Sequence, residues 1–348
     1  MKKIFTFLLA LGFCVSGASG QGFGIPSKKG GIGFGNLAKF TGLRFNYADR
    51  NVDQINGVNV TVWQAKDDSE QTGTVNGLAI GLPLAMGAED MNGVAVGIAG
   101  VAAKRNLSGI NIGGLGVGSG EDVTGINIGG LGVGSGKDLK GVNIGLLGAG
   151  AGEDVTGFNF GGLGVGGGGE LRGINIGGLG AGAGGDVTGL SIGGVGLGSG
   201  GNITGINLAG VGLGSGGSIN GISIAGVGMG AGKDIKGIAI AIVGIGAPKL
   251  RALTISGAAG GNDLAGVFIT PGYLQVGDKH SDEDEVTMNG ASVSAFNNVK
   301  GTQKGVTIGI FNYAKKQRGI QLGLLNYVKD NPKGLRLLPV FNTHFGGK

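Results

Sequence analysis

GINIGGLGVGSGEDVT, residues 109–124, is followed directly by GINIGGLGVGSGKDLK, residues 125–140. The leading glycine of this unit recurs every 16 residues from Gly77 to Gly237 without a slip. In each copy an apolar residue, a small residue or Asn, and a second apolar residue follow that glycine. One unit is too short to bury its apolar side chains alone, so the repeat predicts a stacked array in which neighbours cover one another.

The composition supports an ordered array and excludes two other glycine-rich classes. Glycine accounts for 86 of the 348 residues, whereas there are only 6 prolines and 14% of the residues are charged. Collagen requires glycine at every third residue together with abundant proline, and neither is present. A flexible glycine linker would lack the evenly spaced Ile, Val and Leu residues of this repeat.

The N-terminus has the pattern of a secretory signal peptide. Lys2 and Lys3 precede a short apolar run over residues 4–15, and residues 18–20 form a small-residue cleavage site. The mature chain is therefore expected to begin near Gln21. The alternative, an uncleaved membrane anchor, is disfavoured because the apolar run is shorter than a membrane-spanning helix.

The charge and the cysteine content limit the kinds of site and partner that are expected. The only cysteine, Cys14, lies inside the signal, so neither a disulfide nor a reactive thiol is expected in the mature chain. A formal net charge of +5 is too small to indicate a nucleic-acid partner. The basic residues gather late in the chain, at Lys300, Lys304, Lys315, Lys316, Arg318, Lys329, Lys333 and Arg336.

Within the repeat, apolar residues alternate as they do in β-strands. With the leading glycine as position 1, positions 2, 4, 7, 9 and 15 are apolar. The parity changes between positions 4 and 7, which predicts a bend at the Gly-Gly pair of positions 5 and 6. A second bend fits residues 118–122, where Asp122 can fix a turn. We therefore expect positions 2, 4, 7 and 9 to form the core and position 3 to face outward.

Two short strands and two corners per period predict an all-β fold, a repetitive β-solenoid of about 19 short coils. The alternative is a β-barrel with one strand per repeat, in which neighbouring repeats run antiparallel. The bend inside each repeat and the identical turns at every strand end favour the solenoid.

The expected organisation divides the chain into five segments. These are a signal peptide at 1–20, an N-terminal linker at 21–41, N-terminal irregular repeats at 42–76, the regular 16-residue array at 77–252, and C-terminal irregular repeats at 253–348 with an inserted loop at 271–289.

Position 3 of the repeat supplies the candidate partner face. An outward row of stacked amides could bond along the array, or it could present a lattice to a repetitive partner such as a glycan or ice. The residues of this row are Asn111, Asn127, Asn143, Asn159, Asn175 and Asn207.

Acidic residues offer only weak metal candidates, and no cofactor is expected. Asp122 and Asp138 lie in a glycine-rich turn that resembles a calcium-binding repeat, but the spacing differs and turn capping is the favoured interpretation. Asp282 and Asp284 belong to an acidic run that is typical of a solvated loop. The two histidines, His280 and His344, do not have the spacing of a zinc site.

Enzymatic function is not expected. Residues 196–201 match G-x-G-x-x-G, but no strand–helix unit surrounds them, so the match is explained by glycine content. A phosphate-binding P-loop motif is missing, and no serine, histidine and aspartate arrangement of a hydrolase can be identified.

The units GVTIGIFNYA at 305–314 and GIQLGLLNYV at 319–328, with the GINIGGLGVG series, resemble uncharacterised bacterial glycine-rich surface-repeat proteins. The resemblance covers nearly all of the mature chain. It implies export and a repetitive β fold, and it brings no catalytic residues.

The functional prediction is an exported, non-enzymatic surface or extracellular scaffold. It would act as an adhesin-like rod that presents loops and a repetitive face to an unknown cell-surface or envelope component, with membrane contact left open. The alternative is an outer-membrane β-barrel protein.

Overall fold

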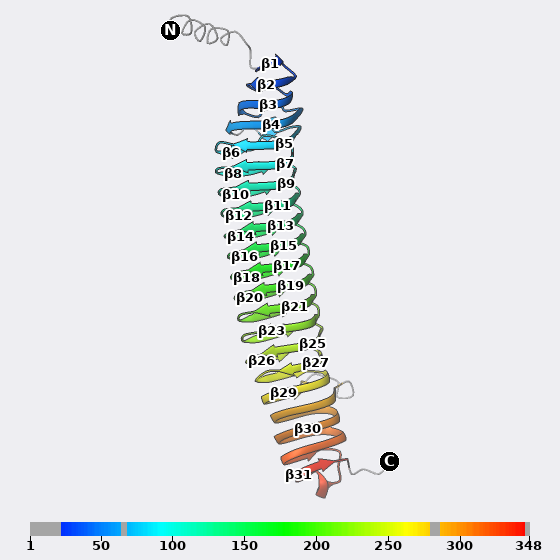
Figure 1. Cartoon of the computed structure of the whole chain (residues 1–348). Helices are drawn as coiled ribbons and strands as arrows, with labels where there is room; N and C mark the ends of the chain where they lie inside the picture. The colour runs from blue at the N-terminus through cyan, green and yellow to red at the C-terminus, as the bar shows by residue number, and fades with distance from the viewer. Residues whose placement is uncertain (1–21, 64–67, 279–285, 345–348) are drawn as a thin grey trace, which may run out of the picture. The chain divides into compact units, whose positions relative to one another are not determined.

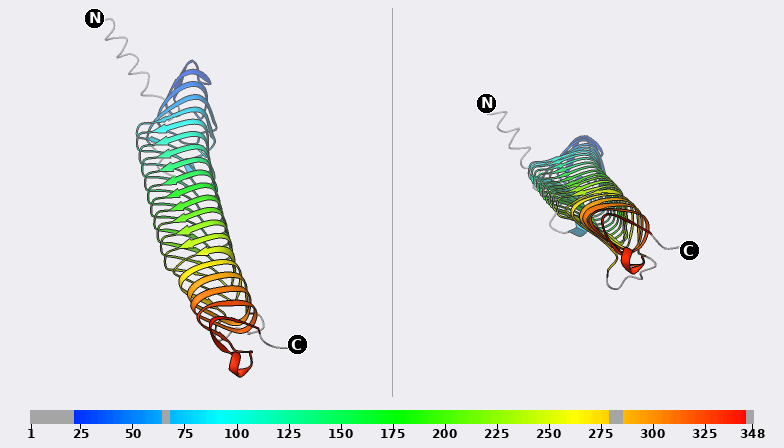
Figure 2. Two further views of the ribbon diagram at one scale, coloured as in Figure 1. Left: turned by 60° about the horizontal axis from the view of Figure 1, so that its bottom comes forward. Right: turned by 90° about the horizontal axis from the view of Figure 1, so that it is seen from below.

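The computed structural model describes residues 22–63, 68–278 and 286–344. The expected signal peptide lies outside these residues. The chain forms two compact units, Met1–Gly152 and Glu153–Lys348. In each unit the chain winds into coils whose strands stack on those of the next coil (Figures 1 and 2). Among the described residues, no helix is both long enough and apolar enough to cross a lipid bilayer.

The first unit contains the N-terminal coils and the start of the regular array. Its elements are β1 (Phe23–Ser27), β2 (Gly30–Phe34), β3 (Lys39–Ala48), β4 (Gln54–Trp63), η1 (Asp68–Glu70), β5 (Thr74–Gly81), β6 (Leu84–Ala85), β7 (Asp90–Gly97), β8 (Gly100–Ala103), β9 (Asn106–Gly113), β10 (Gly116–Ser119), β11 (Val123–Gly129), β12 (Gly132–Ser135), β13 (Leu139–Gly145) and β14 (Gly148–Ala151).

The second unit continues the array and ends in wider coils. Its elements are β15 (Val155–Gly161), β16 (Gly164–Gly167), β17 (Leu171–Gly177), β18 (Gly180–Ala183), β19 (Val187–Gly193), β20 (Gly196–Ser199), β21 (Ile203–Ala209), β22 (Gly212–Ser215), β23 (Ile219–Ala225), β24 (Gly228–Ala231), β25 (Asp234–Ala241), β26 (Gly244–Gly246), β27 (Lys249–Ile255), β28 (Ala258–Gly261), β29 (Asp263–Val276), β30 (Thr287–Val328), η2 (Lys333–Leu335) and β31 (Leu337–Thr343).

Parallel pairing in register confirms the solenoid. Strand β11 pairs in parallel with β9 and with β13, and Asn127 lies opposite both Asn111 and Asn143. The short strand β12 pairs in the same way with β10 and β14. Each residue thus pairs with its equivalent one repeat away, whereas a barrel with one strand per repeat would require antiparallel neighbours.

The leading glycine of the repeat is fixed by backbone geometry. Gly125 has φ of 115°, a region that residues with a side chain rarely adopt. A Cβ atom placed on Gly125 would lie 2.0 Å from the carbonyl oxygen of Gly109 in the preceding coil. Both the backbone conformation and the close coil-to-coil contact therefore require glycine at position 1.

Replacing Gly125 with Ala is expected to lower the free energy of unfolding by about 2 kcal/mol, because it combines an unfavourable φ with a backbone clash. Chemical denaturation followed by circular dichroism measures this loss. Gly132→Ala is the matched control, since its added Cβ would lie 3.4 Å from the carbonyl oxygen of Gly148. Equal losses for the two variants would contradict this account of position 1.

The arrangement of the core differs from the expectation at three of the four expected core positions. Position 9 is buried as expected, with Val117 4% exposed, and position 15 is buried as well, with Val123 0% exposed. Positions 2, 4 and 7 instead face outward: Ile126 is 42%, Ile128 37% and Leu131 49% exposed. Position 3 points inward. The expected core was therefore wrong at positions 2, 4 and 7.

Strand parity explains this difference. The long strand of each coil runs from position 15 through the glycine to position 5 without a break, as β11 does from Val123 to Gly129. Alternation along one strand places positions 15, 3 and 5 on one face and positions 16, 2 and 4 on the other. Positions 15 and 2 cannot share the core, although both are apolar.

Both ends of the array depart from the expected segment boundaries. Within the segment expected to be a linker, residues 22–41 contain paired strands, because β1 and β2 form an antiparallel hairpin and β2 pairs in parallel with β3. The expected insertion at 271–289 is also shorter, since β29 continues to Val276 and β30 begins at Thr287. The expected C-terminal repeats do not continue to residue 348, because η2 follows β30 and precedes the antiparallel strand β31.

Candidate functional site

The asparagine row lies inside the coils, so it cannot be a partner face. In the first unit, Asn111 donates to Asn127 over 2.7 Å, and Asn127 donates to Asn143 over 2.8 Å. In the second unit, Asn159 donates to Asn175 over 2.8 Å. None of the six side chains is more than 1% exposed, which corrects the expectation for Asn111, Asn127, Asn143, Asn159, Asn175 and Asn207.

A carboxamide suits this interior position because it both donates and accepts. Each amide in a stack can satisfy its neighbours, and a buried polar group is tolerated only when it is hydrogen-bonded. At Gly129, two positions further along the strand, the coil leaves no room for a side chain, because a Cβ there would lie 1.9 Å from the carbonyl oxygen of Gly132. The asparagine row is therefore structural, and it holds adjacent coils in register.

The described acidic candidates cap turns or form ion pairs. The Asp122 carboxylate accepts a hydrogen bond from the backbone NH of Asp138 over 3.2 Å. Asp138 in turn pairs with the Lys140 ammonium group at 2.6 Å. Asp282 and Asp284 lie outside the described residues. Within the described ranges, His, Cys, Asp and Glu side chains do not gather into a group of three that could hold a metal ion.

A buried charged cluster lies inside the N-terminal coils. The Arg44 guanidinium group lies 2.5 Å from the Asp49 carboxylate, and both side chains are nearly inaccessible, at 0% and 3% exposure. Asn59 and Thr61 donate to the same carboxylate over 2.7 and 2.9 Å. Arg44 and Asn59 occupy position 3 of their units, so they continue the inward-facing polar row.

Aliphatic side chains cover one edge of each coil and part of the adjoining long-strand face. We call this surface the aliphatic ridge and define it by the outward residues of positions 2, 4 and 7. In the first unit its exposed members include Ile110, Ile112, Leu115, Ile126, Ile128, Leu131, Val142 and Leu147, and in the second unit Leu163, Ile174, Leu179, Val195, Ile206, Val211, Ile222, Val227 and Val243.

The backbone beneath the ridge is satisfied by hydrogen bonds between coils. The NH of Leu131 donates to the carbonyl of Leu115 over 2.6 Å, and Leu147 donates to Leu131 over 2.7 Å. The second unit repeats the pattern, with Leu179 donating to Leu163 over 2.8 Å. At position 7 of each repeat, aliphatic side chains therefore lie over backbone amides that already have hydrogen-bond partners and do not require water.

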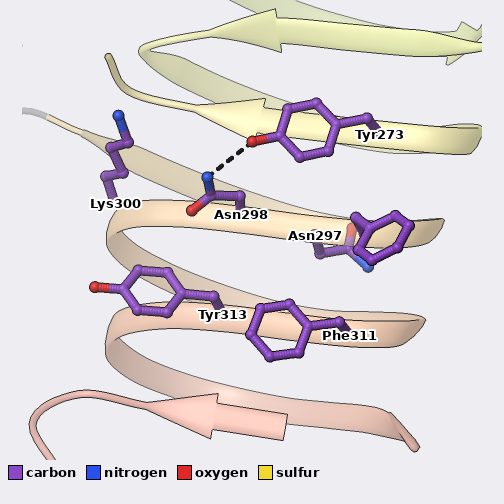
Figure 3. Close-up of a pocket in the computed structure, with 7 residues that line it drawn as sticks. Tyr273, Asn297, Asn298, Lys300, Phe311 and Tyr313 are labelled. Atoms are coloured by element: carbon purple, nitrogen blue, oxygen red, sulfur yellow. Dashed lines mark hydrogen bonds between the residues drawn. The ribbon is translucent and has the colours of Figure 1, made fainter. Parts of the chain in front are cut away.

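The main candidate binding site lies on the outer surface of the C-terminal coils, which β29 and β30 form. We call it the aromatic–lysine groove. It has a volume of about 580 Å³ and is lined by Tyr273, Phe296, Asn297, Asn298, Lys300, Phe311 and Tyr313. Figure 3 shows Tyr273 on one coil, Asn297 and Asn298 on the next, and Phe311 and Tyr313 together on the coil after that, with Lys300 at one side.

Hydrogen bonds and ring stacking hold the walls of this groove. The Asn298 amide donates to the Tyr273 hydroxyl over 2.8 Å and to Gln275 over 3.0 Å. The Tyr313 ring stacks on Tyr327 with centroids 5.5 Å apart and planes 8° from parallel. Partial burial, with smaller contributions from Tyr327 and Asp330, raises the pKa of Tyr313 above its ordinary value.

The sequence contains a signal for this groove. Bulky residues replace glycine in the units that begin at Gly305 and Gly319, and lysines gather in the same part of the chain. The register of the wide coils brings these bulky residues and lysines together.

Comparisons with family models, with curated proteins and with solved structures find no match to this chain.

Proposed function

We propose that this chain is an exported, non-enzymatic scaffold that lies on a lipid surface through its aliphatic ridge. The observation that carries this proposal is the outward orientation of the ridge over successive coils. Monomeric soluble proteins rarely expose apolar patches beyond a few hundred Å². The pattern of residues 1–20 and the resemblance to bacterial surface-repeat proteins support export.

The chemistry of the ridge suits acyl chains better than a protein partner. From Val94 to Val243, positions 2, 4, 6 and 7 contain no charged or hydrogen-bonding side chain. The corner amides already bond between coils, as an apolar medium requires. The opposite edge carries exposed ion pairs, such as Lys137 with Glu121 at 3.2 Å. Apolar and charged surfaces on opposite edges are typical of proteins that lie in a membrane interface.

The test is flotation of the mature chain with phospholipid vesicles in a density gradient. The wild-type protein should float with the vesicles. Leu131→Glu combined with Leu147→Glu places two charges on the ridge and should reduce the bound fraction about tenfold or more, because each charge must leave water to enter the interface.

Thr124→Glu is the control, because Thr124 is exposed and lies outside the ridge. This variant should float like the wild type, and all variants should keep the same circular dichroism spectrum. Flotation of the double glutamate variant at the wild-type level would contradict the proposal. Dimers in sedimentation experiments, without flotation, would assign the ridge to a second copy of the chain instead.

A further inference from the structure

Three successive coils of β30 present matching outward rows beside the groove. Asn297 donates to Asn312 over 2.8 Å and Asn312 donates to Asn326 over 2.7 Å, so these asparagines share one interior position. One residue later along each strand the side chain faces outward, giving the row Asn298, Tyr313 and Tyr327. Three residues later the outward row is Lys300, Lys315 and Lys329.

The lysine row places like charges on adjacent coils. Neighbouring strands lie about 4.8 Å apart, which is close enough for their ammonium groups to repel one another. Asp330 follows Lys329 and offsets part of this charge. Among the residues that the structure describes, no carboxylate forms an ion pair with Lys300. An anionic ligand beside Lys300 would relieve the repulsion.

The aromatic rings next to this row provide flat apolar platforms. Tyr273 is 39% and Phe296 49% exposed, and they lie opposite each other in the parallel register of β29 and β30. The apolar C–H face of a pyranose ring packs against such aromatic rings, while amides and hydroxyls at the rim can bond its hydroxyl groups. The groove volume of about 580 Å³ is within the range of small-molecule sites.

We propose that the aromatic–lysine groove binds an acidic oligosaccharide. The sugar rings stack on Tyr273, Phe296 and Tyr313, and their carboxylates pair with the lysine row. The chemistry favours a chain of uronic acids over a lipid headgroup, because the rings and lysines repeat from coil to coil as sugar units do. This inference goes beyond the lipid-bound scaffold and does not depend on the ridge contacting a membrane.

Isothermal titration of the mature protein with a tetramer of galacturonic acid tests the proposal in the absence of lipid. We expect saturable binding that weakens about tenfold or more between 50 and 500 mM NaCl, because salt screens exposed charges. A neutral tetramer of glucose is the matched ligand control and should bind at least about tenfold more weakly, because it cannot pair with lysines.

Two variants separate stacking from charge. Tyr313→Ala and Lys300→Gln should each weaken binding about fivefold or more, whereas Lys304→Gln removes an exposed charge outside the groove and should leave binding unchanged. Leu131→Glu with Leu147→Glu should also bind the sugar normally, which separates this test from that of the ridge.

Three results would overturn the proposal. These are the absence of saturable binding to the acidic tetramer, equal binding of the neutral tetramer, and equal effects of Lys300→Gln and Lys304→Gln. Binding to anionic phospholipid vesicles through Lys300, without binding to the tetramer, would assign the groove to a lipid headgroup and would also overturn it. Unchanged thermal unfolding of the variants confirms that losses of binding are local.

Discussion

Asn127→Asp is expected to lower the free energy of unfolding by about 3–5 kcal/mol at neutral pH, whereas Ile128→Asp should cost about 1 kcal/mol. Asn127 is 0% exposed and donates to Asn143, so an aspartate there loses that donor and buries a charge. Ile128 is 37% exposed and faces outward, so its replacement keeps the new charge in water.

The pH dependence of the Asn127→Asp variant provides a second readout. Burial raises the pKa of the introduced carboxyl above its ordinary value of about 3.9. A raised folded-state pKa means that stability is retained below the unfolded-state value and lost as pH rises through the folded-state value. The variant should therefore recover stability in mild acid. Urea denaturation at several pH values measures this, and equal losses for both variants would contradict the inward position of the asparagine row.

Asp49→Ala is the second variant with a large expected effect, a loss of about 3–5 kcal/mol in the free energy of unfolding. Removing the carboxylate leaves the fully buried Arg44 guanidinium without its counter-charge and also frees the donors of Asn59 and Thr61. Thermal and urea denaturation measure the loss, and hydrogen exchange should place it in the N-terminal coils.

Asp53→Ala is the matched control for this cluster. Asp53 pairs with Lys39 at 3.7 Å on the surface, where its side chain is 68% exposed, so about 1 kcal/mol or less should be lost. Arg44→Met combined with Asp49→Leu should recover only part of the stability, because it removes the uncompensated guanidinium but leaves the donors of Asn59 and Thr61 without an acceptor. Similar losses for Asp49→Ala and Asp53→Ala would show that the buried pair contributes little.

Much of the fold could be predicted from the sequence because the repeat period sets the register. The constant spacing from Gly77 to Gly237 and the bend between positions 4 and 7 predict coils with parallel pairing. It was harder to predict which side chains face the interior of each coil, because hydrophobicity alone places Ile126 and Ile128 in the core. Continuing the strand parity from Val123 through Gly125 would have placed Asn127 inside.

The candidate groove was harder to predict because it depends on contacts between units of unequal length. Tyr273 and Phe296 become neighbours only after the irregularity between Thr270 and Tyr273 in the pairing of β29 with β30. No fixed period relates these residues. The Arg44–Asp49 pair is difficult to predict for a different reason, since Arg44 occupies position 3, which the sequence pattern places on the outside.

The repeated register of the regular coils also has a consequence at the level of the gene. A coil such as residues 109–124 offers nearly the same surface above as below, because Asn111 and Asn127 occupy equivalent sites. An in-frame duplication or deletion of one repeat therefore adds or removes a coil without creating a new kind of contact. Slippage between such similar stretches of DNA supplies this variation directly, so natural variants should differ by whole repeats rather than by parts of one.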